Sequence, residues 1–332
     1  MDMKKKRVVV IGGGTGTFTA LTALRPHDFD LSAIVAMTDD GGSTGQLRDE
    51  LGVLPPGDLR QALVALSDSP KVMRDLFTYR FSGKVSGGLS GHNFGNLFLS
   101  ALEKVTGNFE TALNQVHQVL HIQGRVIPVT LDHVQLIAKT KSGRRILGEH
   151  SIGDGWFTGK DPLKSIALRP KAHAYSGALS AIKNADYIVI GPGSIFGSLL
   201  PNFLVEGITQ GLSKTKAKII FVCNLVNKYG ETDDFLVEDH VQLLQQYVGE
   251  VFDAVLFNTK IPDVKLLRKY RHEGELIPVP TQKIFSQQGV QFFGYPMIFG
   301  GKVQDKIKKE HFIRHNPVLL GKALIHTFAL LK

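Results

Sequence analysis

RVVVIGGGTGTFTALTAL, residues 7–24, joins a continuous apolar run to a glycine-rich turn and then to a helical pattern. Consecutive β-branched residues from Val8 to Ile11 are typical of a buried strand. The glycines let the backbone approach a phosphate closely, and the helix start offers free N–H groups and a partial positive charge. A tight turn without a ligand is the alternative, because Thr17 stands where G-x-G-x-x-G has its third glycine. We predict that the turn binds a ligand through Gly12, Gly13, Gly14, Thr15 and Gly16.

The same alternation of apolar run, glycine-rich or polar loop and helical pattern continues along the chain. Further strands are expected at residues 31–37, 185–190, 218–222 and 253–257. This alternation predicts an α/β fold with a Rossmann-like, doubly wound, mostly parallel sheet.

The middle of the chain departs from this rhythm. Residues 134–140 and 144–152 flank Lys141-Ser142-Gly143 and indicate a β-hairpin, so we expect an inserted β region at about 126–155. We expect residues 1–332 to form a single domain, with a loop-rich and helical C-terminal segment at about 275–332. Asp58 is expected to be the N-cap of a helix over residues 59–66.

Composition indicates a large buried core and no membrane span. Apolar residues make up 43% of the 332 residues, and no apolar run is long enough to cross a bilayer. The single cysteine, Cys223, lies in an apolar stretch and has no partner for an internal disulfide. A buried thiol in a reducing compartment fits this pattern, so we expect a cytoplasmic protein.

The formal net charge of +9 points to an anionic partner. Nucleic-acid binding would need a basic stripe interleaved with exposed aromatic residues. The basic residues are instead scattered, apart from a tail at 4–7 and a cluster at 302–314. A phosphorylated, nucleotide-type small molecule therefore explains the charge better than nucleic acid. The sequence leaves the formation of a homo-oligomer open.

Two adjacent acidic residues follow the second expected strand, in Asp39-Asp40-Gly41-Gly42-Ser43. Dinucleotide folds place an acidic residue there against a ribose. Two acidic residues with glycines and a serine also suit a hydrated Mg²⁺ beside phosphates, and a helix N-cap is the alternative. We predict ligand contacts from Asp39, Asp40, Gly41 and Ser43, with Asp39 and Asp40 as candidate Mg²⁺ ligands.

Other strand ends carry similar chemistry. Gly191, Gly193 and Ser194 suit a second phosphate or a sugar, and Asn224 suits a base or sugar edge. Because the carboxyl ends of parallel strands meet at one edge of a sheet, these loops are expected to share one ligand site with the first turn.

Two more groups of polar residues belong to the predicted site. His92, Asn93 and Asn96 gather at a helix start, where a cap would need one of them. Arg60 has the reach to bind a phosphate, and a surface ion pair explains it equally well. The remaining histidines show no metal-ligand spacing.

At these segments the chain resembles the YvcK/CofD-like family. The resemblance runs through most of the chain in family order, at residues 12–16, 38–45, 55–60, 91–96, 191–194, 201–202 and 230–232. It implies a Rossmann-like core shared with 2-phospho-L-lactate transferase. It also implies the YvcK branch, which is associated with cell shape and gluconeogenic growth and binds UDP-sugars such as UDP-N-acetylglucosamine.

The resemblance also implies particular residues. In the YvcK branch a tyrosine and an arginine near the C-terminus contact the nucleotide sugar, and Tyr270 and Arg314 match them here. The chain departs from the family at Gly197, which replaces a usual threonine, and at Asn227-Lys228-Tyr229, which replaces a usual Thr-Gln-Pro.

Two functions fit these observations. One is a regulatory protein that binds a UDP-sugar, and the other is a CofD-like transferase of a phosphate-linked group. Neither an activated nucleophile nor a paired general acid and base stands out, so binding without catalysis is favoured. An NAD-binding enzyme is a third interpretation, because the turn at 12–16 suits NAD. A fold alone does not decide between them.

Overall fold

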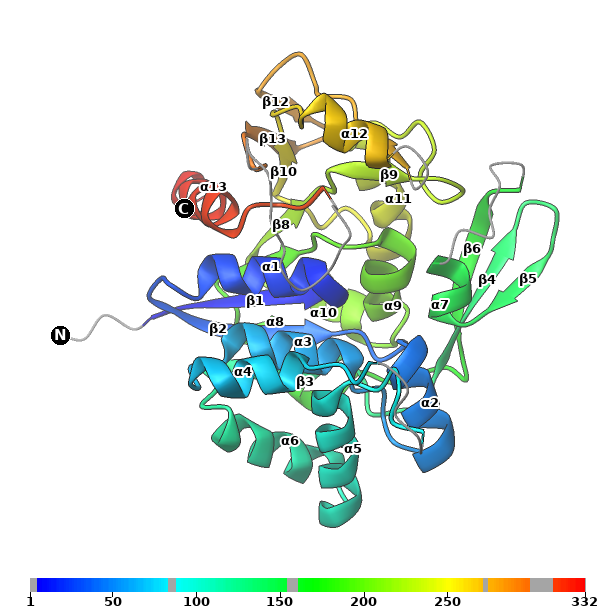
Figure 1. Cartoon of the computed structure of the whole chain (residues 1–332). Helices are drawn as coiled ribbons and strands as arrows, with labels where there is room; N and C mark the ends of the chain where they lie inside the picture. The colour runs from blue at the N-terminus through cyan, green and yellow to red at the C-terminus, as the bar shows by residue number, and fades with distance from the viewer. Residues whose placement is uncertain (1–4, 83–87, 154–160, 271–273, 299–312, 332) are drawn as a thin grey trace.

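The computed structural model describes residues 5–82, 88–153, 161–270, 274–298 and 313–331 (Figure 1). At its centre lies an eight-stranded sheet with the order β12-β13-β10-β8-β7-β1-β2-β3. All neighbouring strands are parallel except β12 and β13. The strands are β1 (Lys6–Gly12), β2 (Phe29–Val35), β3 (Arg125–Pro128), β7 (Tyr187–Ile190), β8 (Lys218–Val222), β10 (Ala254–Asn258), β12 (Ile284–Gln287) and β13 (Val290–Tyr295).

The order of the strands confirms the predicted doubly wound fold. From β1 the chain proceeds through β2 and β3 to one side, and then returns to place β7, β8, β10 and β13 on the other side. The reversal falls between β1 and β7, and open α/β sheets bind ligands at such a point. Val8, Val10 and Ile11 are fully buried, because helices cover both faces of the central strand.

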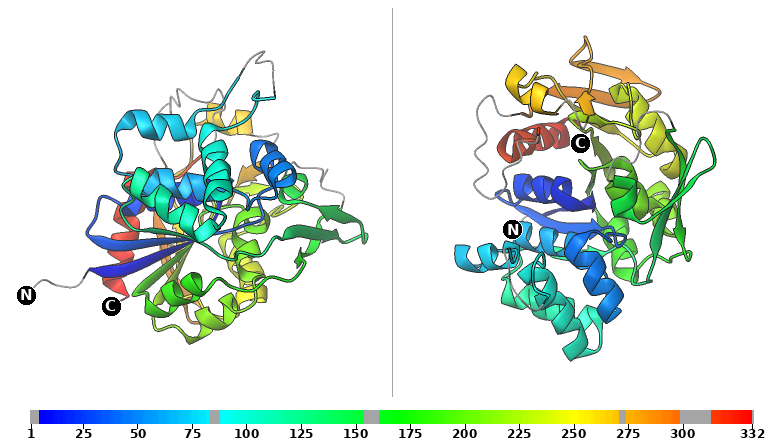
Figure 2. Two further views of the ribbon diagram at one scale, coloured as in Figure 1. Left: turned by 90° about the horizontal axis from the view of Figure 1, so that it is seen from below. Right: turned by 45° about the vertical axis from the view of Figure 1, so that its right-hand side comes forward.

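Helices form a layer on each face of the sheet (Figures 1 and 2). On one face, α1 (Gly14–Leu24) packs between α3 (Gly57–Leu66) and α13 (Pro317–Leu330). The other face carries α8 (Ser176–Asn184), α9 (Leu200–Phe203), α10 (Ile208–Lys214) and α11 (Val237–Val248). Beyond α3 lie α2 (Gly42–Leu51), α4 (Lys71–Thr78), α5 (Phe94–Thr106) and α6 (Phe109–Val119).

A small separate sheet lies beside the main body in Figure 1, at residues 135–169; the inserted β region was expected at about 126–155, a range that includes most of β3 of the main sheet and leaves out the last strand of the small one. Its antiparallel strands are β4 (Gln135–Thr140), β5 (Arg145–Leu147) and β6 (Leu163–Arg169). The prediction that a strand continues to residue 152 was wrong. Gly148 has a φ of +90°, which ends β5, and the helix α7 (Glu149–Gly153) follows at once.

The C-terminal segment contains more regular structure than expected. Strands β12 and β13 form a hairpin that extends the main sheet, and a short strand β11 (Gly274–Leu276) pairs with β9 (Val226–Lys228). Helix α12 (Val264–Tyr270) precedes them. Most of the basic cluster at 302–314 lies outside the described residues. Cys223 is fully buried, and none of the described helices has the length and apolarity that a membrane span requires.

Candidate functional site

A pocket of about 440 Å³ lies at the carboxyl edge of the main sheet, where the strand order reverses between β1 and β7. It unites residues that follow three strands of the main sheet, β1, β7 and β8, with residues of the C-terminal part of the chain. Its lining comprises Thr15, Gly16, Thr19, Pro192, Gly193, Ser194, Ile195, Asn224, Leu225, Val226, Lys228, Glu231, Thr232, Tyr270, Ile313, Arg314 and His315. Seven predicted residues are among them: Thr15, Gly16, Gly193, Ser194, Asn224, Tyr270 and Arg314.

The first glycine turn offers fewer free backbone N–H groups to a ligand than expected. Gly14 has a φ of +62°, which a residue other than glycine rarely adopts. Its N–H donates to the carboxylate of Asp58, so a side chain of the protein already occupies the start of α1. Thr15, Gly16 and Thr19, which come next, line the pocket. Gly12 and Gly13 are buried, and they lie behind the pocket rather than in its lining.

The turn after β7 packs directly on α1. A Cβ at Gly16 would overlap the carbonyl oxygen of Pro192, so this glycine allows the two loops to touch. Gly193 donates its N–H to Asn224 Oδ1 at 3.1 Å, which fixes the Asn224 amide at the pocket wall. Gly191, with a φ of +78°, forms the bend that precedes them and is buried.

An ion pair between a partly exposed lysine and a buried glutamate forms another wall of the pocket. Lys228 Nζ lies 2.7 Å from Glu231 Oε1 and also donates to the carbonyl of Gly153. Ser194 Oγ lies 3.3 Å from Glu231 Oε2. Burial raises the pKa of Glu231, and the Lys228 ammonium opposes that rise. This arrangement holds one ammonium group at the pocket wall.

Tyr270 and Arg314, which the family resemblance implied, lie on the same pocket although 44 positions separate them. Tyr270 ends α12 and is half-buried, whereas Arg314 is exposed. The next residue, His315, is buried, and burial lowers its pKa to about 4. Its Nε2 has no hydrogen-bond partner among the described residues, so the ring stands neutral beside the pocket.

A cluster of carboxyl groups adjoins the pocket. Burial is the largest cause of the raised pKa of both Asp39 and Asp58; the charge of Asp40 adds to the rise at Asp39, and the charge of Asp39 adds to the rise at Asp58, whose pKa reaches about 7. Glu149, on α7, has a pKa raised to about 8, first by burial and then by Asp39, Asp58 and Asp40, while Lys228 opposes the rise. A Cβ at Gly197 would overlap Glu149 Oε1, so the missing threonine leaves space for this carboxyl group.

The two adjacent acidic residues point to different surroundings. Asp39 accepts from the Gly41 N–H at 3.0 Å and faces Asp58, whereas Asp40 accepts from the His150 N–H at 2.8 Å and lies 3.9 Å from Arg48. The structure therefore pairs Asp39 with Asp58, which is not the N-cap that the sequence predicted; the N-cap position of α3 is Pro56. In the described part of the chain, no three His, Cys, Asp or Glu side chains are arranged to hold a metal ion.

The remaining predicted residues form a hydrogen-bonded network outside the pocket. Ser43 Oγ lies 3.2 Å from His92 Nδ1 and accepts from the Asn93 N–H at 3.2 Å. Asn96 accepts from Arg60 Nε at 2.8 Å, and burial lowers the pKa of Arg60 to about 10. These contacts join α2, α3 and α5 behind the carboxyl cluster, and none of these five residues lines the pocket.

Several residues of the site escaped the prediction. Three of them are Lys228, Glu231 and His315, which come near the end of β1 only through the tertiary fold. Glu149 was missed because it lay within an expected strand. The one usable signal for Glu231 was Gly230-Glu231-Thr232, which is among the segments that carry the family resemblance.

Comparisons with known proteins agree with this architecture. The family model for 2-phospho-L-lactate transferase CofD matches residues 8–297. A putative gluconeogenesis factor of Thermotoga maritima is 42% identical over 320 residues, which is 96% of this chain and 98% of that protein. The gluconeogenesis factor of Halalkalibacterium halodurans is 36% identical over 328 residues, covering 97% of each.

Solved structures give the same result. The crystal structure of a UPF0052 family member from Bacillus halodurans superposes with a TM-score of 0.87 at 34% identity, covering 97% of this chain and 99% of that one. The chain therefore belongs to the CofD family, among the relatives that are named gluconeogenesis factors.

Proposed function

We propose that this protein binds a nucleoside diphosphate sugar of the UDP-N-acetylglucosamine type and acts as a regulatory protein linked to cell shape and gluconeogenic growth. The observation that carries the binding proposal is the pocket at the strand-order reversal, lined by both glycine turns together with Asn224, Tyr270 and Arg314. Its volume of about 440 Å³ falls within the usual range for small-molecule sites. The regulatory role rests on the family resemblance.

The polar groups of the pocket suit the parts of such a ligand. Arg314 and Lys228 bring positive charge, and the Arg314 guanidinium suits a bidentate contact with a diphosphate. Tyr270 offers an aromatic face for a base and a hydroxyl for a hydrogen bond. Asn224, held by Gly193, carries an amide NH₂ that suits the carbonyl groups of a base or an N-acetyl group.

A transferase of a phosphate-linked group is the second candidate, and the carboxyl cluster favours it. Asp58 and Glu149, with pKa values of about 7 and 8, are able to exchange protons near neutral pH beside the pocket. Mg²⁺ at this site would have to bind together with the phosphates of the ligand, because no three described carboxyl groups are arranged to hold the ion alone, and Asp39 would be one of its ligands. Bound Mg²⁺ would supply charge neutralisation for the phosphates of a ligand.

Titration calorimetry with UDP-N-acetylglucosamine, with and without Mg²⁺, tests the binding proposal. Arg314→Ala is expected to weaken binding by roughly 1–3 kcal/mol, the scale of a lost charge-assisted hydrogen bond. The control Arg145→Ala, on the exposed edge strand β5, should bind as the wild type does. Equal affinities of the wild type and the Arg314 variant would contradict the proposed site.

Chromatography of the ligand after long incubation with Mg²⁺ separates the two candidate functions. Intact ligand with measurable affinity supports a binding protein. Conversion to UDP or UMP, abolished by Asp58→Asn, would favour the transferase instead.

A further inference from the structure

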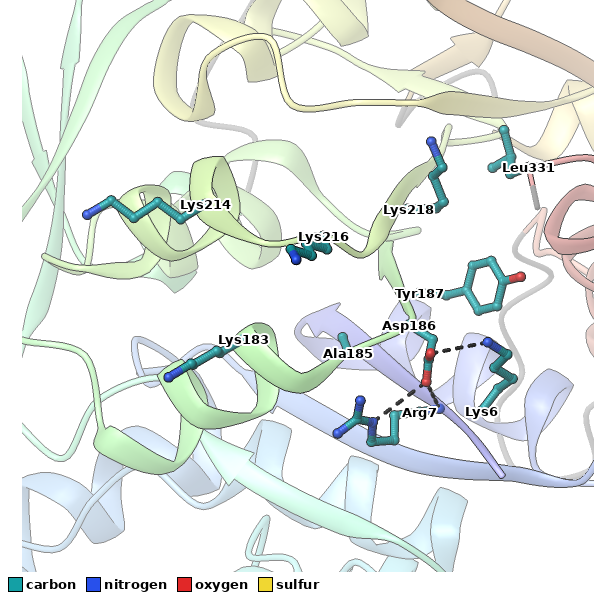
Figure 3. A pocket seen from close by; sticks show the side chains of 10 residues that line it. All are labelled: Lys6, Arg7, Lys183, Ala185, Asp186, Tyr187, Lys214, Lys216, Lys218 and Leu331. Atoms are coloured by element: carbon teal, nitrogen blue, oxygen red, sulfur yellow. Dashed lines mark hydrogen bonds and ion pairs between the residues drawn. The ribbon is translucent and has the colours of Figure 1, made fainter. Parts of the chain in front are cut away.

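A second cavity, of about 670 Å³, lies at the opposite edge of the main sheet, where strands β1, β7 and β8 begin (Figure 3). The ends of α8 and α10 and the loop before β8 complete its wall. Its lining is strongly basic and comprises Lys6, Arg7, Lys183, Ala185, Asp186, Tyr187, Lys214, Lys216, Lys218 and Leu331. Six of these ten residues are lysine or arginine, and one is acidic.

The acidic residue is already neutralised by its neighbours. Asp186 accepts from the Arg7 N–H at 2.8 Å and from Lys6 Nζ at 3.3 Å, as the dashed lines in Figure 3 show. Lys218 pairs at 2.9 Å with Asp253, which lies outside the lining.

Three further cations lack such partners. Lys183, Lys214 and Lys216 are exposed, and no hydrogen bond or ion pair joins their ammonium groups to any described residue. The cavity thus carries a positive charge that the described part of the protein does not balance.

Helix stability explains only part of this gathering. Lys183 and Lys214 lie in the last turns of α8 and α10, where a cation interacts favourably with the helix dipole. Lys216 lies in a loop, and Lys6 and Arg7 begin a strand, so the dipole explains none of these three. Like charges collected around one cavity repel each other, and an anionic ligand would relieve that repulsion.

We propose that this basic cavity binds a small molecule that carries several phosphate groups, at a site separate from the pocket at the carboxyl edge. Lysine is a compact, strongly hydrated charge that binds phosphate oxygens without demanding one fixed geometry. In Figure 3, Lys183 and Lys214 reach to one side of the cavity, and Lys6 and Lys218 lie on the other. That separation suits a ligand with phosphates along its length rather than a single phosphate.

The lining does not suit a nucleic acid strand. Strands of that kind bind through exposed aromatic rings that stack on the bases. Tyr187 is the one aromatic residue of the lining, and it is 6% exposed and stacked on Phe328 with ring centres 4.2 Å apart. A ligand recognised through phosphates alone fits these residues better.

Calorimetric titration with inorganic tripolyphosphate tests this proposal, with ATP and octaglutamate as further probes. The variant Lys183→Gln/Lys214→Gln/Lys216→Gln is expected to lose tripolyphosphate affinity by about tenfold or more, since three charge contacts disappear. The control Lys139→Gln/Lys141→Gln/Lys164→Gln removes the same charge from the inserted sheet and should bind as the wild type does. The single variant Lys216→Gln, in an exposed loop, serves if the triple variant does not fold.

Two further comparisons make the result decisive. Arg314→Ala should retain tripolyphosphate binding, and the cavity variant should retain the binding of UDP-N-acetylglucosamine, because the two sites lie at opposite edges. Comparable affinities for tripolyphosphate and ATP would show that the site recognises phosphate groups alone. Tighter binding of ATP would show that it also recognises the nucleoside. Both outcomes support the site. Equal losses in the two triple variants, no tripolyphosphate binding by the wild type, or tighter binding of octaglutamate would overturn it.

Discussion

The carboxyl groups of Asp39, Asp58 and Glu149 repel one another beside a ligand pocket. The ionised form of each carboxyl group is more stable in water than in this buried position, and the fold nevertheless places all three close together. Such groups favour their protonated forms at a pH where free carboxylates are ionised. Residues of this kind gather at functional sites more often than elsewhere, which is why we connect the cluster with the pocket.

Glu149→Gln is expected to stabilise the protein in a pH-dependent way. The pKa of Glu149 is about 8 in the folded protein, against an ordinary value of 4.5. Between these values the unfolded chain releases the proton and the folded chain keeps it, so the wild type loses stability as the pH rises. The glutamine amide does not titrate, so the variant does not lose this stability. The melting temperature of the variant minus that of the wild type should therefore increase from about pH 4.5 to about pH 8.

Thermal denaturation in the presence of EDTA measures this difference without interference from metal ions. Glu250→Gln changes an exposed side chain and should follow the wild type at every pH. A gap between Glu149→Gln and the wild type that stays constant over the pH range would contradict the raised pKa.

At the scale of elements, the close approach of α1 to the turn after β7 shapes the pocket. Gly16 lies against the carbonyl group of Pro192, at the end of the two paired strands β1 and β7. Because the backbone of both segments is fixed by the sheet, neither is free to move away from a larger side chain.

Gly16→Ala is expected to lower the free energy of unfolding by about 1–3 kcal/mol, the usual scale for overpacking a tight site. Gly211→Ala is a matched control inside α10, where an added Cβ would make only ordinary contacts, the nearest at 3.5 Å from Ile182. It should be neutral or stabilising, because glycine is a poor helix former. Urea denaturation of both variants measures the contrast, and equal stability of the two would refute it.

The elements differ in how well the sequence predicted them. The expected strand at 218–222 coincides with β8, and that at 185–190 contains β7, because both are short apolar runs rich in β-branched residues and followed by turn residues. Helix α7 was missed, since its residues continue an alternating pattern and only the φ of Gly148 ends the strand. The contacts of Asp58 and Glu149 depend on how distant segments meet, and a single sequence carries no periodicity that reports such meetings.

The first and last helices of the described chain pack together. Phe328 of α13 is 4% exposed and lies between Tyr187, stacked at 4.2 Å, and Phe29, edge-on at 5.8 Å. The Tyr187 hydroxyl donates to the Phe328 carbonyl at 3.1 Å. The last helix thereby packs beside α1 on the sheet and contacts β2 and β7.

Phe328→Ala is expected to lower the free energy of unfolding by about 3–5 kcal/mol, as for other buried aromatic side chains. Leu330→Ala, at a position 51% exposed, should change it by less than about 0.5 kcal/mol. The dissociation constant for UDP-N-acetylglucosamine should stay unchanged in both folded variants, because the pocket is at the other edge. Urea denaturation measures the free energy of unfolding, and calorimetry on the same preparations measures the dissociation constant. A Phe328 variant as stable as the wild type would refute the packing argument.

The position of β1 between β2 and β7 has a consequence for synthesis on the ribosome. Strand β2 emerges soon after β1, but β7 begins at Tyr187, about half the chain later. Until then one edge of a central strand that is apolar from Val8 to Ile11 has no partner in the nascent chain, and unpaired strand edges invite aggregation. Synthesis of the segment between β2 and β7 is therefore the interval in which β1 is most open to pairing with the wrong strand.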